Sequence, residues 1–272
     1  YRFAGGEISD EEVIEKYSAI SEALEIQKSR VDAAKKGKYD KYLGQVDKIL
    51  TATGVEISCE FVETKLGPKL TQEADNLNMA KKIFQLMLKG KCIDNPLALE
   101  AAEIIQQNEP TFSVAKFLGQ KNDQLGKTEE AKKFYEEAIG LADSNADKAE
   151  MYVKIAQIQR KAGQKSAARS TARRALSFDP SYSDAYELIG DLYYYSFDQC
   201  AGKTSMVNDR AVYIAAFDQY KRAGNSAKMK AAKSQFPGIN DIFNEAREEG
   251  ESVTVGCWIN TTVKLERRPE NN

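Results

Sequence analysis

The chain has 272 residues, enough for one large domain or two small ones. Its 39 lysines and arginines nearly balance 41 aspartates and glutamates, so no overall basic field attracts nucleic acid, and we expect no nucleic-acid partner. The sequence has no histidine, which excludes most zinc sites and most hydrolase mechanisms. We therefore expect no metal and no other cofactor, and a hydrophobic fraction of 42% with only 6 prolines predicts a globular, helical chain.

The chain begins with Tyr1 instead of methionine and has no signal-peptide pattern. We expect a processed product or an excised fragment whose targeting signal lies upstream. No apolar run is long enough to cross a bilayer, so we expect no transmembrane segment in this fragment.

Residues 9–36 are predicted to form one long amphipathic helix. Ser9 and Glu12 have the spacing of a capping box at its start, and its apolar residues recur at helical intervals. Two further periodic stretches, residues 77–88 and 96–107, predict a degenerate helical pair before Pro110.

An internal repeat follows. Small and aromatic residues recur with a constant shift of 37 positions, so that Gly119 corresponds to Ala156 and Tyr135 to Ala172. A third unit begins 34 positions later, with Gly190, but its second helix is delayed by 14 residues. Each unit is predicted to be two helices, with Gly126 or Gly163 ending the first helix in a left-handed conformation.

These patterns resemble the tetratricopeptide repeat family, with the best unit at about 149–182. Three positions depart from the family's preferences: Asp143 replaces a closing proline, Gln159 a tyrosine and Ala172 an aromatic residue. The resemblance implies an all-α fold, a right-handed superhelix of helical hairpins.

After Ala223 the pattern changes to two capping helices separated by Phe236-Pro237-Gly238. The β-branched and aromatic residues of 252–265 predict a short C-terminal β-hairpin. We expect three segments: an N-terminal helical segment, 1–70; repeats over 71–224, with best units at about 112–145, 149–182 and 183–224; and a C-terminal cap, 225–272.

The hairpin, together with the stretches around Cys92 and Arg210, resembles a group of exported repeat proteins of Bacteroidetes bacteria. This resemblance implies export to the periplasm or outer membrane of a Gram-negative cell. The four cysteines fit either buried free thiols or disulfides with three possible pairings. The resemblance, together with chain order, favours Cys59 with Cys92 and Cys200 with Cys257.

In the family, the first helix of each pair lines a concave groove that binds proteins or peptides. The resemblance therefore implies groove positions on three successive first helices: Lys116, Gln120, Asp123, Val153, Gln157, Arg160, Asp184, Glu187, Asp191 and Tyr194. The acidic third helix does not suit the family's clamp for a peptide carboxylate. The alternative is that these residues only keep the groove soluble.

A basic stripe lies along one predicted helix within residues 160–174, which contain six cations and no acid. Its members are Lys165, Arg169, Arg173 and Arg174. Aligned cations attract anions, so this helix and the groove tyrosines suggest a receptor for an anionic or glycan ligand. The alternative is a solvated helix face neutralised by neighbouring acids.

No catalytic motif is complete. Gly202-Lys203-Thr204 matches the end of a phosphate-binding loop, but Phe197 stands where that motif requires glycine. Trp258 is predicted to be a packed hairpin residue. The sequence favours a non-catalytic scaffold in the bacterial envelope, with the anion or glycan receptor second and an enzyme third; its oligomeric state stays open.

Overall fold

The structure, a computed structural model, describes residues 8–55, 57–72 and 77–269. The chain divides into two compact units, Tyr1–Leu118 and Gly119–Asn272. This division differs from the predicted segment boundaries at residues 70 and 224, which stay predictions. Among the described residues, no helix is long and apolar enough to cross a membrane.

The first unit begins with a helical hairpin instead of the single helix predicted over residues 9–36. That prediction is wrong beyond Ser29, because Asp32 adopts an extended conformation and starts a second helix. The Ser9 half of the predicted capping box is confirmed, since the Ser9 hydroxyl accepts a hydrogen bond from the Glu12 amide at 3.2 Å. The hairpin consists of α1 (Asp10–Ser29) and α2 (Ala33–Thr53).

Five short elements complete the first unit: α3 (Cys59–Phe61), the π-helix η2 (Val62–Leu66), α4 (Gly67–Gln72), α5 (Leu77–Lys89) and α6 (Pro96–Asn108). The last two form the predicted degenerate pair. The Tyr17 hydroxyl donates to Asp47 at 2.8 Å and accepts from the Lys89 ammonium at 2.6 Å, which ties α5 to the hairpin. Helix α7 (Phe112–Gln124) crosses into the second unit.

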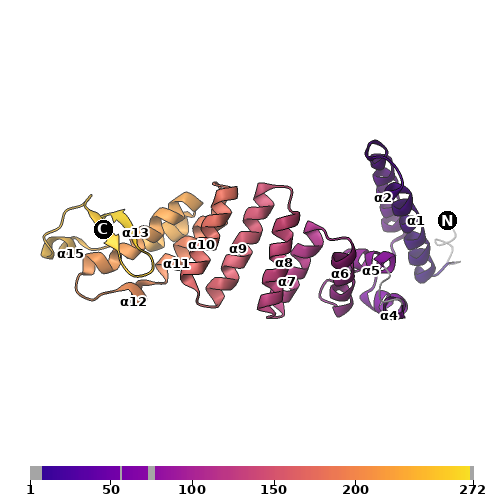
Figure 1. Cartoon of the computed structure of the whole chain (residues 1–272), viewed down its shortest axis with the longest axis horizontal. Helices are drawn as coiled ribbons and strands as arrows, with labels where there is room; N and C mark the ends of the chain where they lie inside the picture. Colours follow the sequence, from indigo (N-terminus) through magenta and orange to yellow (C-terminus); the bar gives the residue numbers. More distant parts are fainter. Residues whose placement is uncertain (1–7, 56, 73–76, 270–272) are drawn as a thin grey trace. The chain divides into compact units, whose positions relative to one another are not determined.

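The second unit is a row of helices that follow one another in chain order (Figure 1). They are α8 (Thr128–Leu141), α9 (Asn145–Lys161), α10 (Lys165–Phe178), α11 (Ser183–Tyr194), α12 (Phe197–Cys200), α13 (Met206–Ala223), α14 (Ser226–Lys233) and α15 (Ile239–Asn244). Gly126 and Gly163 both have a φ of +74°, which confirms the predicted left-handed helix ends.

Glycines let helices of a pair approach closely at two equivalent positions. A Cβ atom on Gly119 would lie 2.6 Å from the Tyr135 ring, and one on Gly190 would lie 2.5 Å from the Tyr220 ring. The equivalent positions of the middle pair hold two buried alanines, Ala156 and Ala172. At residue 172, where the family prefers an aromatic residue, the middle pair therefore has a small buried side chain, and a second small residue stands at the position equivalent to Gly119.

The predicted C-terminal hairpin is confirmed. Strands β1 (Ser252–Val255) and β2 (Thr261–Lys264) pair antiparallel, with Val253 opposite Val263. Their inward side chains join the same hydrophobic core as α11 and α13. Trp258 packs against Tyr193, with ring centres 5.9 Å apart, as predicted for a packed hairpin residue.

Two disulfides are present, in the pairing that the resemblance favoured. Cys59 joins Cys92 within the first unit, and Cys200 joins Cys257 within the second. The second bond ties the insertion after α11 to the hairpin. In that insertion, the Asp209 carboxylate accepts hydrogen bonds from the amides of Gly202 and Lys203, so an aspartate occupies the donors that a phosphate-binding loop would offer.

We predict that Gly190→Ala lowers the free energy of unfolding of the second unit by about 1–3 kcal/mol, because the added methyl group displaces the Tyr220 ring. Denaturant unfolding followed by fluorescence of Trp258, the chain's single tryptophan, reports on this unit. Gly140→Ala in α8 is the control. It adds a methyl group to an exposed site with no neighbour within 4 Å, so it raises stability by about 0.5–1 kcal/mol. Equal effects from both variants would contradict the packing argument.

Candidate interaction surface

The first helices of successive pairs are joined by ion pairs at their C-terminal ends. Lys161 of α9 donates to both carboxylate oxygens of Asp123 of α7 at 3.0 Å. Arg160 of α9 donates to Asp191 of α11 at 3.2 Å. Each first helix thus contacts the next one through a charge pair as well as through the core.

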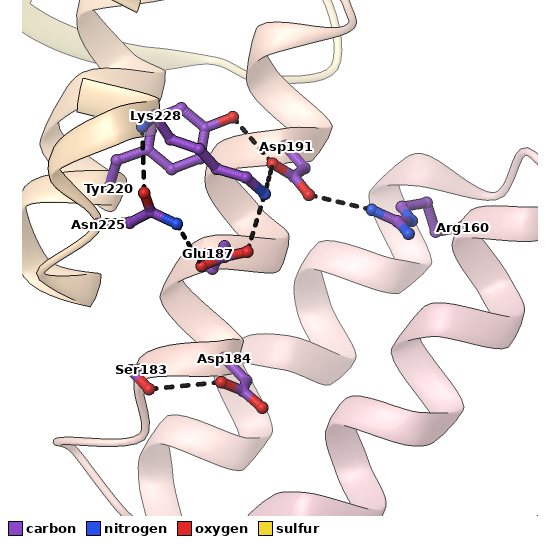
Figure 2. Close-up of polar contacts among 8 residues, drawn as sticks. All are labelled: Arg160, Ser183, Asp184, Glu187, Asp191, Tyr220, Asn225 and Lys228. Atoms are coloured by element: carbon purple, nitrogen blue, oxygen red, sulfur yellow. Dashed lines mark hydrogen bonds and ion pairs between the residues drawn. The ribbon is translucent and has the colours of Figure 1, made fainter. Parts of the chain in front are cut away.

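The acids of α11 form the centre of a larger network, drawn in Figure 2. The Lys228 ammonium, from α14, lies 2.8 Å from Glu187 and 2.7 Å from the near oxygen of Asp191. The Tyr220 hydroxyl donates to that same Asp191 oxygen at 2.9 Å. Asn225 donates its side-chain amide to Glu187 at 2.8 Å, so each carboxylate has at least two donors.

Burial and charge shift the pKa values within this network. Hydrogen bonds from Lys228 and then Asn225 hold the pKa of Glu187 below its usual range. Burial lowers the pKa of Lys228, but its bonds to Asp191 and Glu187 outweigh this and raise it above its ordinary value. Burial and the neighbouring Asp191 charge raise the pKa of Tyr220. These shifts favour a charged Glu187 and a charged Lys228 beside a neutral Tyr220.

Seven of the predicted groove positions lie in the second unit with polar side chains, and they divide into three groups. Asp123, Arg160, Glu187 and Asp191 take part in the ion pairs above. Gln120 and Gln157 are half-buried, and Asp184 is exposed, with its carboxylate 3.4 Å from the Ser183 hydroxyl and away from the network in Figure 2. We call these seven residues the first-helix surface.

Three predicted positions fall outside this surface. Val153 is only 3% exposed and lies in the hydrophobic core, so it does not offer the groove side chain that was predicted. Tyr194 packs edge-on against Tyr195 and Tyr213, with ring centres 5.1 and 5.2 Å away. Lys116 belongs to the first unit, where its ammonium lies 5.7 Å from the centre of the Phe112 ring.

The basic stripe on α10 is used largely for internal contacts. Lys165 donates to the Tyr195 carbonyl at 3.0 Å, near the end of α11, and to the Ser196 hydroxyl at 2.9 Å. Arg169 donates to the Ile259 carbonyl and lies 5.1 Å from the centre of the Trp258 ring.

The two remaining cations of the stripe differ from each other. Arg174 lies 4.9 Å from the centre of the Tyr152 ring, whereas Arg173 is exposed and has no side-chain partner among the described residues. The aromatic rings that contact this stripe come from distant positions in the sequence.

Sequence reasoning missed Lys228, Asn225 and Tyr220 as members of the network. Asn225 caps α14 through its side chain, which accepts from the Lys228 amide at 3.1 Å. This cap fixes the first turn of α14, from which Lys228 reaches α11. An asparagine before a helix was a visible capping signal, but the partner acids could be found only from the folded arrangement.

The described residues contain no group of three or more cysteine, aspartate, glutamate or histidine side chains placed to hold a metal ion. Glu187 and Asp191 are already paired with Lys228 and Arg160, so they do not form a free carboxylate pair for acid–base chemistry. The chemistry that this surface offers is hydrogen bonding and charge pairing.

Comparison with known proteins identifies the repeats. The tetratricopeptide repeat family model matches residues 117–145 and 149–182, in agreement with two of the predicted repeat units. No curated protein matches the sequence. The extended likeness to exported Bacteroidetes proteins stays a prediction.

Solved structures with similar folds include a crystal structure of MamA, with 17% identity and a TM-score of 0.44, covering 63% of this chain and 89% of that one. Another is YrrB, described as a tetratricopeptide repeat protein with an unusual peptide-binding site, with 15% identity and a TM-score of 0.47, covering 72% of this chain and 89% of that one.

We predict that Glu187→Gln destabilises the second unit by about 0.2–1 kcal/mol at neutral pH and that this cost disappears in acid. The unfolded carboxyl group has a pKa near its ordinary value of 4.5 and the folded one a lower pKa, so its contribution is complete above 4.5 and is lost as pH falls through the folded pKa. Denaturant unfolding of the native protein and of the Glu187→Gln variant, at about pH 3 to 7, checks this sign because carboxyl groups titrate in that range.

The control uses Lys228→Met as the background. There the Glu187→Gln cost at neutral pH should be smaller than in the native background, because the stronger of the two donors is gone. A cost that stays constant with pH in the native background would refute the assignment of the ion pair.

Proposed function

We propose that this protein is a non-catalytic scaffold that binds a protein or peptide partner through the first-helix surface. The observation that carries the proposal is the coupling of α7, α9 and α11 by Asp123–Lys161 and Arg160–Asp191, which sets polar side chains of successive repeats in one row. Gln120 and Gln157 occupy equivalent positions in two repeats and have amide groups suited to an extended backbone.

The surface is preorganised for such a partner. Asp191 is 13% exposed at its side chain and receives donors from three helices, so its orientation is fixed before anything binds. Binding then loses little side-chain or backbone entropy, which is the main cost that a flexible surface would incur.

We also propose that the protein works in the oxidising envelope of a Gram-negative bacterium, in the periplasm or at the outer membrane. The two disulfides support this, because disulfides persist in exported proteins and are rare in the reducing cytosol. All four cysteines are used in them.

The second candidate function is a receptor for an anionic or glycan ligand. One observation favours it: a pocket of about 440 Å³ is lined by Arg160, Lys165, Asp191, Leu192 and Tyr195, and Tyr195 is 73% exposed. Against it, Lys165 and Arg169 already make internal contacts, which leaves little free charge on the stripe. Ligand binding that weakens steeply between low and moderate salt would favour this candidate over the protein scaffold.

We predict that a photo-crosslinking amino acid placed at Gln157 captures a specific partner in living cells, because this side chain lies within the first-helix surface. The same group placed at Gln120 should capture the same partner. At Lys133, whose side chain is 72% exposed on the second helix α8, it should not. Mass spectrometry of the adducts identifies the partner, and equal capture at all three positions would contradict the proposed surface.

For the compartment, we predict that a non-reducing peptide map of protein from its native cell shows Cys59 linked to Cys92 and Cys200 linked to Cys257. The expected result has no free thiol at these four positions. Protein unfolded in the presence of an alkylating agent provides the control against disulfide exchange during work-up. Four free thiols would place the protein in a reducing compartment and overturn the envelope assignment.

A further inference from the structure

A groove lies at the C-terminal end of the repeat array, and none of its lining residues belongs to the first-helix surface. It is a groove of about 1200 Å³ between α13, α14, the start of α15 and the tail after β2. The tail is held beside the break before α15, since the Arg268 amide donates to the Pro237 carbonyl at 2.9 Å. We call this feature the terminal groove.

Apolar side chains line part of the terminal groove. Phe217 and Met229 are half-buried and pack against the hydrophobic core from the groove side. Ile239, in the first turn of α15, is 52% exposed. The groove therefore offers apolar contacts on a fixed support, because Phe217 is itself packed edge-on against the fully buried Phe236 at 5.5 Å.

The charged lining of the groove is mainly basic. Among the residues that the structure describes, Lys230, Lys233 and Arg268 line it, together with one acid, Asp241. The Asp241 carboxylate accepts a hydrogen bond from the Gly238 amide at 2.7 Å and so caps α15. Lys233 has Glu266 at 3.8 Å, a partly exposed pair that contributes little, and its ammonium lies 5.6 Å from the Phe217 ring centre.

We infer that the terminal groove binds an acidic amphipathic peptide segment of a partner protein, with carboxylates facing Lys230, Lys233 and Arg268 and apolar side chains on Phe217, Met229 and Ile239. Excess positive charge around an apolar surface selects this chemistry, since charge complementarity and buried apolar contacts then act together. The inference rests on the proposed scaffold function and gives it a second, chemically distinct docking site.

The size and shape of the groove favour a peptide over other anionic partners. Its volume exceeds the roughly 300–1000 Å³ of most small-molecule pockets. A lipid bilayer surface presents its charge broadly and would not enter a concavity as well as an extended or helical segment does. Anionic vesicles therefore serve as the alternative in the test.

The test selects binders from a display library of random short peptides on the intact, oxidised protein. We expect the enriched peptides to combine aspartate or glutamate with leucine, isoleucine, phenylalanine or tryptophan. Their affinity should fall at least about tenfold for the double variant Lys230→Glu, Lys233→Glu and also for Met229→Ser, as measured by fluorescence anisotropy.

The matched control is Lys127→Glu, Lys133→Glu, which makes the same change in net charge at two exposed lysines of the α8 region and should leave affinity unchanged. Circular dichroism of each variant establishes that it is folded. A parallel sedimentation assay with phosphatidylglycerol–phosphatidylcholine vesicles tests the membrane alternative.

The inference would be overturned by enriched peptides without acidic residues, by equal losses in the control variant, or by a selection that enriches no peptide. In the last case, vesicle binding that the Lys230→Glu, Lys233→Glu variant abolishes would indicate a membrane partner instead. Two further results distinguish failure of the scaffold function from failure of the terminal groove. Peptides that lose affinity for Gln157→Trp but not for the groove variants would support the first-helix surface and refute the terminal groove. Photo-crosslinking that fails at Gln120 and Gln157, while peptides still bind the terminal groove, would support the groove and refute the first-helix surface.

Discussion

The second unit depends on contacts between each helical pair and the next. A repeat array has no single central core, so every interface must be stable by itself. Two kinds of contact act together. Small residues, such as Gly190 against Tyr220, let the two helices within a pair approach closely, and charge pairs such as Arg160–Asp191 link the first helices of successive pairs. The same charge pairs also form most of the proposed binding surface, so stability and recognition use the same side chains.

The C-terminal end of the array is partly covered by the β-hairpin. In a repeat array, the last repeat has no following repeat to cover its apolar face, so that face would be exposed. Here the hairpin of β1 and β2 covers part of that face with Val253, Val255 and Val263, and the Cys200–Cys257 disulfide fastens it. The cover ends at the terminal groove, where Ile239 stays exposed beside three cations. This incomplete cover is the structural origin of the second docking site.

Much of the fold could be predicted from the sequence because repeats impose a period that survives substitution. The left-handed Gly126 and Gly163 agree with the prediction from this period, and the hairpin agrees with the prediction from its β-branched and aromatic residues. The cysteine pairing also agrees, but it was favoured only by the resemblance to exported proteins and by chain order. The helix break after Ser29 was missed, because the apolar periodicity continues through Val31 and only the extended conformation of Asp32 interrupts it. For the candidate surface, residue types showed which side chains were polar but not that Lys228 would neutralise two of them. That contact joins positions 37 and 41 residues apart through the folding of α14 onto α11.

The central claim is that the network around Asp191 couples neighbouring repeats and holds the binding surface in place. Hydrogen–deuterium exchange of the intact protein and of Lys228→Met, resolved by peptide, tests it most directly. The account predicts faster amide exchange in α11 and α14 of the variant, with the exchange of α8 unchanged. Unchanged exchange in α11 would contradict the claim, because the first-helix surface would then be rigid without the network that is proposed to hold it.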